Sequence, residues 1–252
     1  MKFETLMEID LNKLKSNTKF LCKSYSDYTY KIANLKDNAY GMGLSIVNTL
    51  VNNGINYILV GPIKDALEIR KYNNEVPVLV NYWVTEEEVF DAINNDITLT
   101  ITSLEYLRSI TCLDIKDDLK LQILIDNGSN KIGLKNNLEL NEAVEIIRST
   151  KHLKLVGIYT DLTTIGVEDE YYYQQINAFY QIIGNFLDSD IMIHLNEPIM
   201  YHKKLSYVNG IRFDLALIGI EENINDDWLT NMRIKNVEKR YGDLEFPNIH
   251  LQ

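Results

Sequence analysis

The chain has 252 residues, of which 46% are hydrophobic and 24% are charged, a balance that is ordinary for a soluble globular protein. Twenty-five basic residues against 36 acidic residues give a net charge of −11, so the chain should repel a phosphate backbone, and we expect no nucleic-acid partner. No apolar run approaches the ~18 residues of a membrane span, and the N-terminus lacks the layout of a signal peptide. The spacing of Cys22 and Cys112 suits neither a metal site nor a disulfide framework. We therefore expect a cytoplasmic protein with no membrane association and no metal.

Short apolar runs that suit strands alternate along the chain with amphipathic stretches that suit helices. The expected strands are residues 6–10, 30–35, 57–60, 76–80, 98–102, 119–125, 155–160 and 191–195. The expected helices run through residues 11–21, 46–51, 65–72, 85–93, 103–110 and 172–186. Such alternation implies parallel strands, and about eight units in roughly 220 residues fit a closed (β/α)8 (TIM) barrel. An open doubly wound sheet is the alternative.

The second expected strand delivers a lysine to its end and then breaks into a turn bracketed by glycines. Residues 36–43 read Lys-Asp-Asn-Ala-Tyr-Gly-Met-Gly. A neutral lysine amine can form a Schiff base with an aldehyde, and Tyr40 lies four residues on, within reach of the same pocket. A surface lysine before a loop is the plainer interpretation of this spacing taken alone.

Four segments resemble the alanine racemase family, and they occur in the family's order. Residues 36–43 match its pyridoxal-phosphate lysine motif, Lys-Ala-Asn-Ala-Tyr-Gly-His-Gly, at six of eight positions. Residues 126–133 resemble its Asp-Thr-Gly-Met-Asn-Arg-Ile-Gly segment, and residues 157–160 resemble its Gly-Ile-Phe-Thr. Residues 211–219 resemble its Val-Arg-Pro-Gly-Ile-Ala-Leu-Tyr-Gly, so the likeness extends over most of the chain.

The resemblance implies a pyridoxal 5′-phosphate cofactor and five residues that hold it. Lys36 would be the catalytic residue and would bind the cofactor as a Schiff base, while Tyr40 would reach its phosphate. Arg212 would face the pyridine nitrogen and so disfavour its protonation. Lys131 takes the place of an arginine that contacts the phenolic oxygen, and His194 matches a hydrogen-bonded histidine at a strand end. In a TIM barrel these positions would all meet at the carboxyl ends of the strands.

Several positions depart from the family's pattern. Asp161 stands where the family stacks a histidine against the pyridine ring, and Glu197-Pro198 stands where an Asn-Ser pair binds phosphate. Asp214 replaces a glycine whose amide faces the phosphate, and Leu124 replaces a lysine that many members carbamylate. Because carboxylates repel a phosphate dianion, these changes predict weaker cofactor binding.

The resemblance divides the chain into a barrel, residues 1–225, and the short start of a C-terminal β domain, residues 226–252. In the family, that domain supplies across a dimer interface the tyrosine that acts as the second base. Residues 232–243 resemble the domain's first strand and turn, which places Leu244-Glu245-Phe246-Pro247 where the tyrosine would be. We expect the second base to be lost; Tyr241 is the alternative.

Two functions remain open. The first is a pyridoxal-phosphate-dependent racemase that acts on a small amino acid, in which Lys36 serves one face of the substrate and activity is reduced when the chain acts alone. The second is a non-catalytic pyridoxal-phosphate-binding barrel, or a partner subunit of a full-length racemase. The expected assembly is a homodimer or a complex with such a racemase. Lys36, Tyr40 and Arg212 favour cofactor binding, whereas Glu197 and Asp214 favour loss of turnover.

Overall fold

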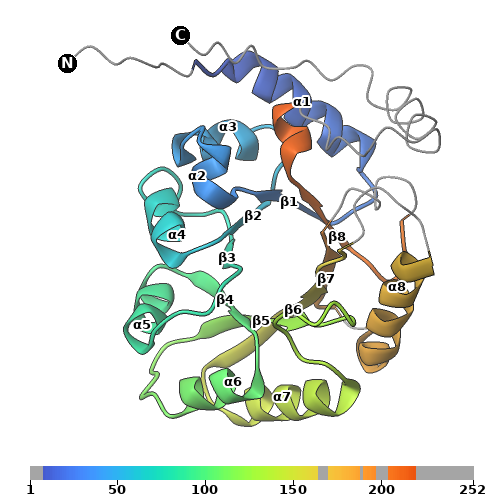
Figure 1. Ribbon diagram of the computed structural model, residues 1–252. Coiled ribbons are helices and arrows are strands. Elements are labelled where there is room, and N and C mark those ends of the chain that lie inside the picture. The colour runs from blue at the N-terminus through green and yellow to red at the C-terminus, as the bar shows by residue number, and fades with distance from the viewer. Residues whose placement is uncertain (1–7, 164–169, 188–189, 197–203, 220–252) are drawn as a thin grey trace.

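Eight short parallel strands pair in sequence order and close into a barrel (Figure 1). The computed structural model describes residues 8–163, 170–187, 190–196 and 204–219. The strands are β1 (Tyr30–Asn34), β2 (Tyr57–Val60), β3 (Val78–Val80), β4 (Ile97–Ile101), β5 (Leu119–Ile125), β6 (Leu153–Thr160), β7 (Met192–Leu195) and β8 (Gly210–Phe213). β8 pairs with β1 and so closes the ring, which confirms the (β/α)8 barrel and excludes the open doubly wound sheet.

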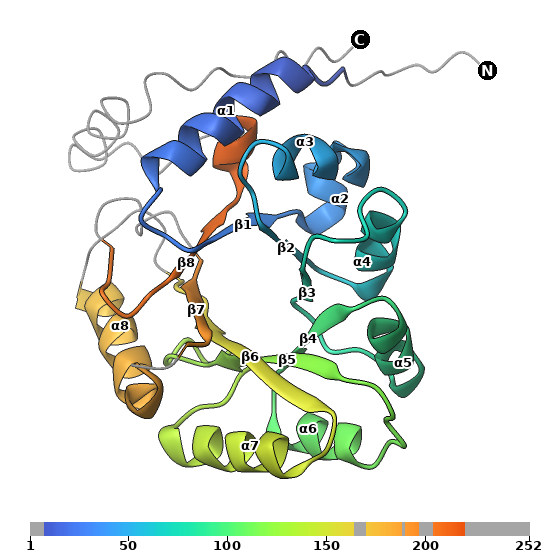
Figure 2. The ribbon, with the colours of Figure 1, turned by 180° about the vertical axis from the view of Figure 1, so that it is seen from behind.

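Helices surround the strands, as the views from the front and from behind both show (Figures 1 and 2). They are α1 (Leu11–Ser24), α2 (Lys36–Tyr40), α3 (Val47–Val51), α4 (Ile63–Arg70), α5 (Glu86–Asn94), α6 (Leu104–Thr111), α7 (Asn137–Ser149) and α8 (Glu170–Ile182), with 3-10 turns η1 (Leu44–Ile46), η2 (Gly184–Phe186) and η4 (Leu215–Ile218). Side chains cap several of them: Asp10, Ser103 and Asn136 each accept a backbone N–H of the first turn. Thr85 and Glu88 form a capping box that starts α5.

Three elements differ from the sequence-based expectation. Residues 8–10 form no strand, because Asp10 instead caps α1, and residues 6–7 lie outside the described part of the chain. Two elements, α7 and β8, were not expected from the sequence pattern. In α7 the buried residues Leu140, Ala143, Val144 and Ile147 follow helical spacing. The proposed start of a β domain at residues 226–252, with Tyr241, also lies outside the described residues, so the domain division stays a prediction.

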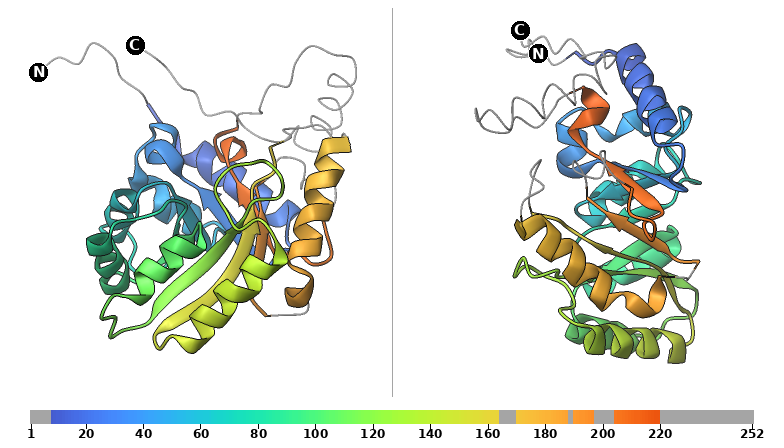
Figure 3. Two further views of the ribbon diagram at one scale, coloured as in Figure 1. Left: turned by 60° about the horizontal axis from the view of Figure 1, so that its bottom comes forward. Right: turned by 90° about the vertical axis from the view of Figure 1, so that its right-hand side faces the viewer.

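Strand residues alternate between the barrel interior and the surrounding helices, as the two-residue period of a strand requires. Ile32, Leu59, Leu79 and Met192 are members of one buried cluster. Their neighbours on the same strands belong to a larger cluster that also includes helix residues. In the left view of Figure 3 the yellow-green helix α7 lies along the outside of β6, and α6 packs against β4 and α7. Within the described residues, no helix combines the length and apolar character that a membrane crossing would need.

Candidate active site

The segment labelled α2, just after β1, is a left-handed turn that begins at Lys36 and is not a right-handed helix. Residues 37–40 all have φ between 52° and 56°, and Gly41 and Gly43 follow at φ 84°. The left-handed region costs a non-glycine residue roughly 1–2 kcal/mol, so the surrounding structure must hold this turn in place. Backbone bonds do so: the N–H of Gly43 donates to the carbonyl of Asn38 at 3.0 Å, and that of Ala39 donates to Leu35 at 3.1 Å. These bonds hold the turn that follows Lys36 at the end of β1.

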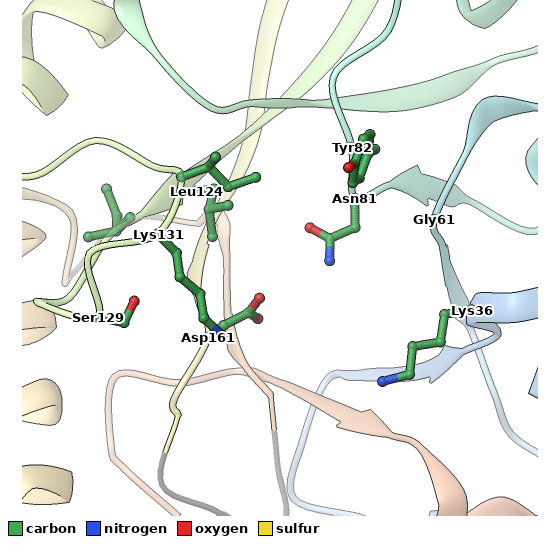
Figure 4. A pocket seen from close by; sticks show the side chains of 10 residues that line it. Lys36, Gly61, Asn81, Tyr82, Leu124, Ser129, Lys131 and Asp161 are labelled. Atoms are coloured by element: carbon green, nitrogen blue, oxygen red, sulfur yellow. The ribbon is translucent and has the colours of Figure 1, made fainter.

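A cavity of about 280 Å³ lies where the strands end, and Lys36 lines it. Further lining residues come from the ends of β3, β5 and β6 and from the loop after β5; they include Asn81, Tyr82, Leu124, Lys131 and Asp161. In Figure 4 the Lys36 amine points toward the side of the cavity where Asp161 and Lys131 lie. The structure thus brings two of the predicted residues, Lys36 and Lys131, to one cavity. Tyr40 lies next to it, with its ring centroid 5.7 Å from the Lys36 amine.

The loop that carries Lys131 is held by Asp126. The Oδ1 atom of Asp126 accepts hydrogen bonds from residues 128–130 at 3.1–3.2 Å. Gly133 then lets the chain return to β5: its φ is +133°, and a Cβ atom there would lie 2.6 Å from the Asp126 nitrogen. The matched motif at residues 126–133 therefore has a structural task, which is to set the cavity wall that includes Lys131.

Arg212 on β8 is buried, with 2% of its side chain exposed, and it pairs with a residue of the cavity wall. Its Nη2 donates to Asp161 Oδ1 at 2.6 Å and to the Thr160 carbonyl at 2.9 Å. Its Nε has no hydrogen-bond partner among the described residues. Asp161 neutralises the buried guanidinium, which leaves the Nε N–H as a buried donor without a partner in the described part of the chain. The sequence placed Asp161 among the carboxylates opposed to phosphate, whereas the structure gives it a cationic partner.

His194 lies deeper in the barrel than the cavity and stacks on Tyr159, with ring centroids 4.6 Å apart and planes 9° apart. Its Nε2 lies 2.8 Å from Gln122 Oε1, and Gln122 Nε2 donates to the Tyr57 hydroxyl, so Nε2 of the histidine carries the proton. Burial, with a smaller effect of the Arg212 charge, holds the pKa of His194 well below its ordinary value. His194 is therefore a neutral supporting group and does not line the cavity.

Asn81 is a cavity residue that the sequence analysis missed. The Tyr159 hydroxyl donates to its Oδ1, and the same hydroxyl lies 3.0 Å from Thr100 Oγ1. Burial is the main reason that the pKa of Tyr159 is raised, so the phenol stays protonated. An asparagine directly after the buried apolar strand β3 was the available signal, because strand ends carry the site residues of a TIM barrel.

Asp214, which follows β8, is the carboxylate that bears on anion binding. The Asn34 side chain hydrogen-bonds to it, while its Oδ1 atom has no hydrogen-bond partner among the described residues. Burial raises the pKa of Asp214, and the nearby Arg212 and Lys36 charges oppose that rise. Glu197 and Pro198 fall outside the described residues.

Asp214→Asn should raise the melting temperature at neutral pH. Because the folded pKa of Asp214 is raised, the folded chain binds more protons than the unfolded chain between the ordinary aspartate pKa, about 3.9, and the folded value. Stability therefore falls as pH rises through that window, and asparagine removes this cost. Melting curves from pH 3 to 8 should show a difference that vanishes at the acid end. The exposed Asp117→Asn is the control; an equal response in both variants would contradict the expectation.

Comparison with known proteins gives one consistent result. A model of the alanine racemase N-terminal domain matches residues 9–213. Alanine racemase 1 of Bacillus subtilis is 27% identical over 220 residues, covering 86% of this chain and 57% of the relative, and the enzyme of Halalkalibacterium halodurans is 30% identical, covering 86% and 58%. The chain thus spans less than two thirds of these relatives.

Solved structures agree on the fold. An alanine racemase of Clostridium difficile superposes with a TM-score of 0.80 at 23% identity, covering 88% of this chain and 60% of that one. A histidine racemase of Leuconostoc mesenteroides superposes with a TM-score of 0.75 at 20% identity, covering 86% and 59%. At these identities the superpositions support the barrel and leave the substrate open.

Proposed function

Because the chain belongs to the alanine racemase family, we propose that it binds pyridoxal 5′-phosphate through Lys36 and moves the α-proton of a small amino acid. The observation that carries the proposal is the cavity that Lys36 enters, whose wall residue Asp161 holds the buried Arg212 with its Nε unpaired among the described residues. When bound, this cofactor withdraws electrons from the amino acid and so acidifies its α-hydrogen. Lys36 would hold the cofactor covalently and exchange the proton on one face.

The other residues fit this group as binding and positioning groups. A buried N–H without a hydrogen-bond partner lowers the stability of the folded chain. Arg212 Nε would gain a partner by donating to the ring nitrogen of the cofactor. Lys131 adds a cation on the opposite wall of the cavity from Lys36. Tyr40 would reach the phosphate. The ring of His194 stacks on Tyr159 and so helps to position it. Asp214, a buried carboxylate near Lys36 and Arg212, opposes an anion.

We further propose that residues 1–252 racemise slowly by themselves. Each positioned acid or base is worth roughly 10²- to 10⁴-fold in rate, and racemisation uses one on each face. Besides Lys36, the titratable side chains that line the described cavity are Tyr82, Lys131 and Asp161. Arg212 already holds Asp161, and Tyr82 is 54% exposed, so neither is a buried, positioned second base. The second candidate, a cofactor-binding barrel or a partner subunit that forms a dimer with a racemase, is favoured by the carboxylate of Asp214.

The test is to incubate the purified chain with pyridoxal phosphate and L-alanine, or L-histidine, in D₂O. α-Deuteration is followed by proton NMR and configuration by chiral chromatography. We expect deuterium to enter faster than the D-isomer accumulates. Rapid formation of D-alanine would contradict the slow racemisation, cofactor binding without deuteration would favour the non-catalytic function, and failure to bind the cofactor would refute both.

A further inference from the structure

Asn81 presents a hydrogen-bond donor to the cavity. It follows β3 directly, and its backbone N–H donates to the Val60 carbonyl at 2.9 Å, which fixes the residue to the neighbouring strand β2. Its side chain lines the cavity and in Figure 4 points into the space that the Lys36 amine enters. The Nδ2 atom has no hydrogen-bond partner among the described residues, whereas Oδ1 accepts from Tyr159.

The orientation of the Asn81 amide follows from the hydrogen bonds of Thr100 and Tyr159. Thr100 Oγ1 lies 2.7 Å from the Val80 carbonyl, which can only accept, so the single Thr100 proton is used there. The Tyr159 hydroxyl donates to Asn81 Oδ1, and an amide oxygen can only accept. Tyr159 is itself held between His194, stacked at 4.6 Å, and the Arg212 guanidinium, 5.3 Å from its ring centroid. The amide nitrogen therefore faces the cavity.

We propose that Asn81 is a ligand-binding residue that donates a hydrogen bond from Nδ2 to the ring hydroxyl oxygen of the bound cofactor. The inference rests on the proposed function, in which Lys36 takes the aldehyde carbon and Arg212 Nε takes the ring nitrogen. The ring oxygen, which the resemblance places near Lys131, is then the acceptor that remains on the aromatic ring, and an oxygen can accept a second hydrogen bond. A neutral amide donor suits that oxygen, whereas a phosphate dianion is better matched by cations and backbone N–H groups. Tyr159 acts as the positioning residue for Asn81.

The experiment compares two ligands and four variants. Dissociation constants are measured for pyridoxal 5′-phosphate and for 3-deoxypyridoxal 5′-phosphate, which lacks the ring oxygen. Asn81→Leu should weaken binding of the first ligand roughly tenfold and leave binding of the second unchanged, because only the first offers the acceptor. Asn81→Asp, which keeps the acceptor for Tyr159 but removes the donor, should weaken the first at least as much. Asn12→Asp, an exposed position on α1, controls for the added charge.

The outcomes separate the inference from the function on which it rests. Equal affinities of wild type and Asn81→Leu for pyridoxal phosphate, or equal losses for both ligands, would overturn the role of Asn81 alone. A wild-type chain that binds neither ligand would overturn the proposed function and the inference with it. Tyr159→Phe should weaken pyridoxal phosphate binding less than Asn81→Leu does, because the amide remains but is no longer oriented. Melting temperatures of all variants show whether each is folded.

Discussion

Lys36→Ala should abolish the visible absorbance that the wild-type chain acquires with pyridoxal phosphate, and it should leave the melting temperature within a degree or two. The absorbance requires a bond between a lysine amine and the cofactor's aldehyde carbon, and Lys36 is the proposed amine. The side chain is exposed at the cavity and makes no hydrogen bond or salt bridge within the described residues, so its removal should change stability by less than about 0.5 kcal/mol.

Lys131→Ala is the matched control, because Lys131 lines the same cavity from the opposite wall. That variant should keep the absorbance and bind the cofactor more weakly. Reduction with borohydride followed by peptide mass spectrometry should place the modification on Lys36 alone. An undiminished absorbance in Lys36→Ala, or a modified Lys131 peptide, would refute the assignment.

The barrel could be predicted because each of its repeating strand–helix units can be recognised from a short stretch of sequence. Buried apolar runs such as β2 and β3 stand out between amphipathic helices, and the alternation of strand and helix implies parallel pairing. β8 was harder to separate, since its four residues include Gly210 and a buried arginine in place of a continuous apolar run. The buried spacing of α7 was present in the sequence and should have marked a helix.

The site could be predicted only where a residue follows a recognisable motif. Lys36 and Lys131 belong to such segments, and the structure brings both to one cavity. The pairing of Arg212 with Asp161 joins positions 51 residues apart on β8 and the end of β6, so no local spacing encodes it. The same holds for Tyr159 and Asn81, whose hydroxyl and amide meet only because the barrel closes.

Asp161→Asn should destabilise the chain because Arg212 would keep a buried charge without its carboxylate. Removing one partner of a fully buried ion pair costs about 3–5 kcal/mol. Arg212 is 2% exposed but the Asp161 side chain is 35% exposed, so solvent screens part of the pair and we expect about 2 kcal/mol. That loss corresponds to a melting temperature lower by about 4–8 °C for a chain of this size. The control is Glu142→Gln, which breaks an exposed pair with Arg108. It should change the free energy of unfolding by less than about 1 kcal/mol.

Adding Arg212→Met to Asp161→Asn should restore much of the lost stability, because the double variant leaves no uncompensated charge among the apolar side chains of the barrel. The same pair of variants separates stability from binding. Asp161→Asn keeps the Arg212 Nε donor and should still acquire the visible absorbance with pyridoxal phosphate, whereas the double variant loses the donor and should bind it at least tenfold more weakly. Thermal denaturation and cofactor titration of the wild type, Asp161→Asn, Arg212→Met and the double variant complete the double-mutant cycle. If Asp161→Asn melts with the wild type, or if the double variant is less stable than Asp161→Asn, then Asp161 does not neutralise Arg212.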